Sequence, residues 1–227
     1  MKVLSAFVLA FLLPAAIAQG PAPLPRNYKP ILDNADVLVQ RVHYGAHEFV
    51  PMHDHPAVTT VYVYLNNSGI VDIAHEGGST LHRPPTHTGA FRVSPGAFER
   101  HSVQNTSDLP SDFLRIELKH VPIKSLPAEF RGQAPKEPYH SATETLYDNP
   151  ALRIERILCV AVEKCVGEGE ASPSVLVVIP LNSTSEPKQN PVIWLPANKD
   201  PYDIKDVNAI EGLDEPYEIL RIVLPKH

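Results

Sequence analysis

The chain has 227 residues, a length typical of one large domain or two small ones. Hydrophobic residues make up 43% of it and charged residues 20%, which is a globular composition and excludes a disordered chain. The net charge of −6 and the lack of a basic run argue against nucleic acid or an anionic membrane surface as a partner. Two cysteines exclude a four-thiolate zinc site, and 24 prolines favour short strands joined by turns over long helices.

The N-terminal segment has the pattern of an export signal. Lys2 precedes the apolar run Val3–Ile17, and Ala16-Ile17-Ala18 ends it with small residues at the two cleavage positions. The run is too short for a membrane-spanning helix, which needs about 20 apolar residues. We therefore predict that a signal peptide, residues 1–18, is removed and that the mature protein is secreted or periplasmic and not held in a membrane. An uncleaved anchor is the alternative.

The two cysteines, Cys159 and Cys165, lie close together in the sequence. Export would place them in an oxidising compartment, where thiols tend to pair. We predict a disulfide between them; two buried small hydrophobic side chains are the alternative.

Short segments of alternating apolar and polar residues follow one another along the mature chain. They are predicted as strands at Val37–Val42, Val61–Leu65, Phe113–Leu118, Leu152–Leu158, Val175–Ile179, Val192–Leu195 and Ile219–Leu224. Turn-rich segments separate them, and no helical period is sustained. Residues 121–143 are rich in proline and are predicted as a connector, with one helical turn near Pro127–Arg131. Many short strands with frequent turns predict an all-β sandwich or barrel.

The second half of the chain repeats the first. Arg41–Leu65 aligns with Arg156–Pro180 without a gap, and Leu114–Leu118 aligns with Leu220–Leu224. The sequence therefore predicts two β domains, residues 31–120 and 144–227, joined by the connector.

A candidate metal site lies in the first copy. His53 and His55 are two residues apart, and on a strand such residues point to the same face with their Cα atoms about 6.6 Å apart. Two imidazoles at that spacing can converge on one metal ion. For an isolated pair, two exposed histidines in a polar loop would be the better interpretation.

The residues around this pair resemble the two sequence motifs of the cupin superfamily. The first motif is matched by Gly45, His53-Asp54-His55, the strand Val61–Leu65 and Gly69. The second is matched by the segment from Gly89 to Pro95, then His101 and Asn105. The resemblance covers about residues 37–119. Together with the repeat it implies a bicupin, two tandem copies of the double-stranded β-helix or jelly-roll barrel.

The resemblance implies that His53, His55 and His101 hold a divalent metal ion, with iron, manganese, zinc, copper and nickel all open. The family's glutamate ligand falls at Thr60, which is a poor ligand, and Glu99 is a candidate substitute because it lies two residues before His101. Three neutral imidazoles leave positions for water, substrate or dioxygen. With no carboxylate to offset the charge of the ion, such a site favours an anionic substrate.

The second copy lacks these histidines. Glu168-Gly169-Glu170 replaces the first pair, and the position of His101 falls near Tyr202. The C-terminal domain is therefore predicted to be a degenerate cupin with no imidazole site of its own.

Three functions remain open at this point. The protein is a dioxygenase-like oxidoreductase that uses the metal ion on a small molecule, a noncatalytic protein that binds a small ligand, or a metal-free structural bicupin. A small molecule is the expected partner in the first two, and a homodimer is left open. The sequence assigns no catalytic residue and no substrate.

Overall fold

The structure, a computed structural model, describes residues 24–126, 128–160, 166–167, 172–182, 190–197, 202–203 and 216–225. Every strand pair in these ranges is antiparallel, and the only helical element in them is a short 3-10 turn at Ile123–Ser125. The predicted all-β class is confirmed. No helix in the described part of the chain is long and apolar enough to cross a membrane.

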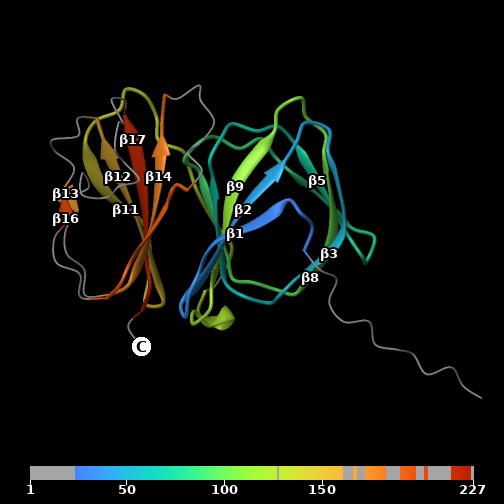
Figure 1. Ribbon diagram of the computed structural model, residues 1–227, viewed down its shortest axis with the longest axis horizontal. Helices are drawn as coiled ribbons and strands as arrows, with labels where there is room; N and C mark the ends of the chain where they lie inside the picture. The colour runs from blue at the N-terminus through green and yellow to red at the C-terminus, as the bar shows by residue number, and fades with distance from the viewer. Residues whose placement is uncertain are drawn as a thin grey trace, which may run out of the picture.

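Three sheets lie side by side as layers (Figure 1). The central sheet has the strand order β1 (Tyr28–Asp33), β2 (Val37–Tyr44), β9 (Ser111–Leu118), β4 (Thr60–Tyr64), β7 (Phe91–Ser94) and β10 (Phe130–Gly132). The outer sheet has the order β3 (Phe49–His55), β8 (Glu99–Asn105), β5 (Val71–His75) and β6 (Thr80–Arg83). Between β2 and β9 the chain passes back and forth between these two sheets, which is the path of a jelly roll.

The C-terminal sheet forms the third layer. Its order is β11 (Ala142–Asn149), β12 (Leu152–Cys159), β17 (Tyr217–Val223), β14 (Ser174–Pro180) and β15 (Val192–Leu195). A separate short pair joins β13 (Val166–Gly167) to β16 (Tyr202–Asp203). The jelly-roll path is complete only in the first copy within the described residues, so the second barrel and the exact domain boundaries stay predictions.

The central sheet is buried on both faces, and strand alternation assigns a different chemistry to each. On β9, Leu114 and Ile116 are buried in an aliphatic core that the central sheet shares with the C-terminal sheet. Phe113 and Arg115, which alternate with them, line a cavity between the central and outer sheets. One face of this sheet therefore stabilises the fold while the other forms a pocket.

The contact between the central and C-terminal sheets includes one buried ion pair. Arg156 donates from Nε to Oε1 of Glu218 at 2.6 Å and from Nη2 to the carbonyl oxygens of Gln133 and Gly89. Gly89 has a φ of +82°, and a Cβ there would collide with the Glu218 carboxylate. The position therefore requires glycine for both its backbone conformation and this close approach.

The connector differs from its prediction. The expected helical turn near Pro127–Arg131 is wrong: the turn lies at Ile123–Ser125, and Phe130 begins β10, which pairs with β7. The Phe130 ring packs against Phe91 with ring centroids 5.9 Å apart, and this contact favours a strand there. The strands β1 and β11 were also not predicted.

Cys159 is buried at the end of β12 and is not a free thiol. Cys165 lies outside the described residues, so its pairing with Cys159 stays a prediction.

Candidate metal centre

Two strands of the outer sheet bring the three predicted ligands together. His53 on β3 lies directly opposite His101 on β8, and His55 is two residues further along the same face of β3. One ring nitrogen from each histidine lies within 4.8 Å of the other two, and all three side chains are buried. The structure therefore brings His53, His55 and His101 together, and their role as ligands stays a prediction.

A hydrogen-bonded chain fixes the tautomer of His53. Its Nδ1 is 2.8 Å from the carbonyl oxygen of Pro51, which can only accept, so Nδ1 carries the proton and Nε2 has a free lone pair. The Tyr28 hydroxyl donates to that lone pair at 3.0 Å, and the Tyr44 hydroxyl lies 2.6 Å from the Tyr28 hydroxyl. A metal ion would take the same lone pair and free the Tyr28 hydroxyl for another acceptor.

The donor set fits a divalent metal ion. The Nδ1 atoms of His55 and His101 are buried without a hydrogen-bond partner, which costs free energy unless another group binds them. Burial is the main reason that the pKa of His53 is lowered, and it lowers that of His55 to about 2 and that of His101 to about 3. The three rings are therefore neutral at physiological pH, the form that binds metal.

The rings must approach one another slightly to share one ion. Two nitrogens about 2.1 Å from the same ion are about 3.4 Å apart in tetrahedral geometry. The present ligand atoms are separated by up to 4.8 Å. Small side-chain rotations would close this difference, and they would also break the Tyr28–His53 hydrogen bond.

One carboxylate approaches the cluster, though it does not belong to the group of three ligand atoms. Glu99 has Oε2 3.5 Å from Nδ1 of His101. Thr60, at the family's glutamate position, donates to the carbonyl oxygen of Val58 and lies opposite Glu117 on β9. Glu117 forms a buried ion pair with Arg115. A carboxylate is therefore available beside His101 even though Thr60 is not a ligand.

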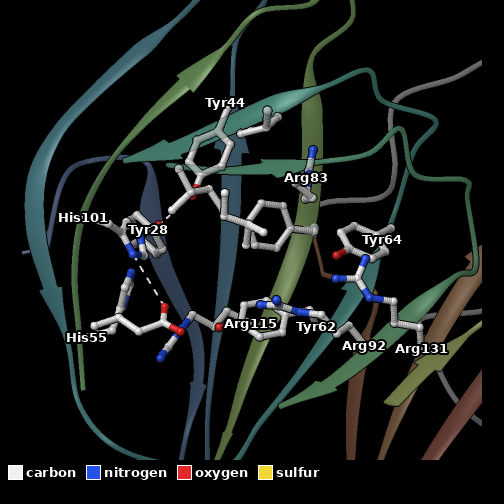
Figure 2. Close-up of a pocket in the computed structure, with 15 residues that line it drawn as sticks. Tyr28, Tyr44, His55, Tyr62, Tyr64, Arg83, Arg92, His101, Arg115 and Arg131 are labelled. Atoms are coloured by element: carbon white, nitrogen blue, oxygen red, sulfur yellow. Dashed lines mark hydrogen bonds and ion pairs between the residues drawn. The ribbon is translucent and has the colours of Figure 1, made fainter. Parts of the chain in front are cut away.

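A pocket opens beside the histidines, between the central and outer sheets (Figure 2). Its cavity of about 50 Å³, the space open to the centres of water molecules, has room for roughly three to five of them. The lining combines aromatic rings with cations, and among the described residues one carboxylate belongs to it, that of Glu99. The cationic and phenolic side chains are Arg83, Arg92, Arg115, Arg131, Tyr28, Tyr44, Tyr62 and Tyr64.

The other histidines of the first copy are not in this cluster. His47 and His82 are exposed and pair with Asp108 and Asp72, so both lie on the solvated surface. His75 packs edge-on against His101 with ring centroids 5.7 Å apart, but its nitrogens do not join the group. Glu168 and Glu170, the predicted replacements in the second copy, lie outside the described residues.

Sequence patterns did not single out Tyr28 or the arginines of the pocket. Tyr28 lies on β1, 25 residues from the histidine to which it donates, in a strand with no clear alternation. Two of the arginines could have been found from the alternation of side chains along the strands. Arg92 on β7 and Arg115 on β9 both lie opposite Tyr62 on β4, so all three side chains are on the same face of the sheet.

Comparisons with known proteins agree with this architecture. Neither the protein families nor the curated proteins give a match to the sequence. Among solved structures, AerE from Microcystis aeruginosa matches over 91% of this chain and 99% of its own, with 13% identity and a TM-score of 0.52. A putative glyoxylate-induced protein from Pseudomonas aeruginosa matches over 91% of this chain and 85% of its own, also with 13% identity and a TM-score of 0.52.

A cupin domain from Bordetella pertussis is similar at 23% identity over 40% of this chain and 91% of its own, with a TM-score of 0.35. Likeness at these levels of identity concerns the fold. The jelly-roll strand order of the first copy has the same implication. The chain therefore has the fold of the first two of these solved structures, and this fold is consistent with the resemblance of its sequence to cupins.

Proposed function

We propose that this protein binds one divalent metal ion through His53, His55 and His101 and acts as a dioxygenase-like oxidoreductase on a small anionic substrate. The observation that supports this most directly is the convergence of three buried, neutral imidazoles beside a cavity. Buried polar atoms normally have partners, and two of these rings have a nitrogen without one. A structural role alone gives no reason to gather three such rings.

The charge of the pocket supports an anionic substrate. Among the described residues four arginines line it, and three carboxylates lie in or beside it: Glu99 in the lining, and Glu117 and Glu129 paired with three of the arginines. An excess of positive charge remains. A divalent ion held by neutral imidazoles would add two further positive charges, and the low-dielectric walls would strengthen the attraction for an anion. The small cavity favours a compact molecule over a polymer.

The side chains around the histidines have distinct tasks in this proposal. A bound metal ion would act as a Lewis acid and offer positions for substrate and dioxygen. Tyr28 would remain protonated, because burial raises its pKa well above the usual value, and its hydroxyl would donate a hydrogen bond to a ligand at the site. Glu99 lies beside His101 on the pocket wall, where its carboxylate can accept a proton from substrate.

Arg115 and Glu117 would together set the electrostatic potential at the three histidines. Arg115 lies close enough to the three histidines to lower the pKa of each, and Glu117 offsets its charge. Without that partner, the guanidinium would repel a metal cation.

Elemental analysis of the mature protein, purified without an affinity tag, tests the metal site. We expect close to one divalent metal per chain in the wild type and a stoichiometric loss in His101→Ala. His82→Ala is the matched control, because His82 is an exposed histidine paired with Asp72, and it should keep the metal. Metal-free wild type, or full metal content in His101→Ala, would show that the histidines are not a metal site.

Oxygen consumption tests the catalytic part separately. The metal-loaded protein is incubated with a panel of small carboxylates, and dioxygen uptake is compared with that of His101→Ala. Uptake that requires both substrate and His101 supports an oxidoreductase. A protein that keeps its metal and binds carboxylates without any uptake is instead a noncatalytic binding protein.

A further inference from the structure

Arg83 is a buried cation whose charge no acid neutralises within the described residues. It ends β6, is 8% exposed and lines the same pocket as the histidines. One terminal nitrogen donates to the hydroxyls of Ser68 and Ser111, at 3.1 and 3.0 Å. Both partners are neutral, so they satisfy donors without compensating the charge.

The other arginines of the pocket differ in this respect. Arg115 pairs with Glu117, and Arg92 and Arg131 share the carboxylate of Glu129, so each of the three has a carboxylate in contact although Glu129 offsets only one of its two charges. For Arg83, the described part of the chain provides no carboxylate in ion-pair contact, and its Nε is buried without a hydrogen-bond partner. A guanidinium stays charged at physiological pH, so burying it unpaired is costly. The free energy of the buried Arg83 guanidinium would therefore be lowered by an anion bound beside it.

The surfaces next to Arg83 indicate what kind of anion fits. Its guanidinium carbon lies 5.5 Å from the centre of the Tyr64 ring and 5.9 Å from that of Phe113. Val71, Ile73 and Leu81 contribute apolar side chains to the same cavity. An inorganic anion would leave these surfaces uncovered, whereas an organic anion with an apolar body would bury them.

The position of Arg83 along the barrel sets it apart from the histidine cluster. Arg83 pairs across the ladder with Val71 on β5, and His101 pairs with His75 on the same strand. Val71 and His75 are four residues apart on β5, so these two cross-strand pairs are separated by about 13 Å along the strand. In Figure 2, His55 and His101 lie on one side of the pocket and Arg83 lies towards the other.

We propose that Arg83 is an anion subsite that binds the carboxylate of a small organic acid, whose apolar body lies against Tyr64 and Phe113 and points toward the histidines. This inference deepens the proposed function, since it names the substrate class of the same pocket. The subsite itself needs no metal, because all of its contacts come from protein side chains.

Isothermal titration with butyrate and with butyramide tests the subsite. The two probes have nearly the same shape, and only butyrate is charged. We expect wild type to bind butyrate at least about tenfold more tightly than butyramide, a difference typical of hydrogen bonds to a charged group. Arg83→Met should lose this preference, while Arg41→Met, whose arginine pairs with Asp112 and does not line this pocket, should keep it. Arg83→Lys should keep part of it, since the charge remains without the planar fork.

His101→Ala separates this inference from the metal proposal. If Arg83 is the subsite, His101→Ala should lose the metal and still prefer butyrate over butyramide. Arg83→Met should keep the metal and lose that preference. Two results would overturn the inference: equal affinity of wild type for the two probes, or a preference that disappears in His101→Ala and persists in Arg83→Met. The second would place the carboxylate on the metal. Because the wild-type comparison needs no variant, the test holds even if Arg83→Met does not fold.

Discussion

The pH dependence of stability should reveal which of two opposing effects controls Glu218. This carboxyl is fully buried between the central and C-terminal sheets, and it accepts a 2.6 Å hydrogen bond from Arg156. Burial disfavours its charged form, while Arg156 favours it. Burial has the larger effect and raises the pKa of Glu218 from 4.5 to about 7.

The sign and size of the effect follow from proton linkage. Between pH 4.5 and 7 the unfolded chain has lost the Glu218 proton and the folded chain keeps it, so the folded state binds more protons and stability falls as the pH rises. A difference of about 2.5 pH units corresponds to about 3 kcal/mol of unfolding free energy at most. Above pH 7 the decrease should level off, because both states are then ionised.

Urea denaturation of wild type and Glu218→Gln at pH values of about 4.5, 6 and 8 measures this difference. Glutamine keeps an oxygen for Arg156 and does not titrate, so subtracting the two curves cancels all other ionisations. We expect wild type to lose up to about 3 kcal/mol relative to the variant over this interval. Glu144→Gln, on an exposed part of β11, should show no such trend. A flat difference would mean that Arg156 cancels the effect of burial, and one that favours wild type as the pH rises would mean that Arg156 outweighs it.

Three further predictions concern the core, the metal site and the N-terminus. Ile116→Ala removes a fully buried side chain from the core between the central and C-terminal sheets. Denaturation should show a loss of about 2–5 kcal/mol in the free energy of unfolding, and a loss below about 1 kcal/mol would argue against that shared core. Glu117→Gln leaves the Arg115 charge uncompensated beside the histidines, and metal titration should give an affinity about 10–100-fold weaker; unchanged affinity would show that Arg115 does not influence the site. Mass analysis of the exported protein should find a chain beginning near Gln19, and an intact Met1 would instead favour the uncleaved anchor.

The sequence by itself determined the features that depend on local spacing. Alternation of apolar and polar residues located β2, β9, β12, β14, β15 and β17 to within about two residues, because side chains on a strand point to opposite faces in turn. The same rule placed His53 and His55 on one face of β3 before any contact was known. The resemblance to cupins then supplied His101, and β8 brings that residue to the pair.

Only the tertiary structure decided what surrounds those histidines. The donation from Tyr28 to His53 joins strands of different sheets, and Arg83 faces Ser111 across 28 residues of chain. No local pattern encodes such contacts, since they depend on how the sheets pack. The uncompensated charge of Arg83 is also a property of the fold, because all four pocket arginines look alike in sequence and differ only in whether a glutamate reaches them. Spacing therefore predicted the ligands of the site, and packing determined its charge and the ligand it can accept.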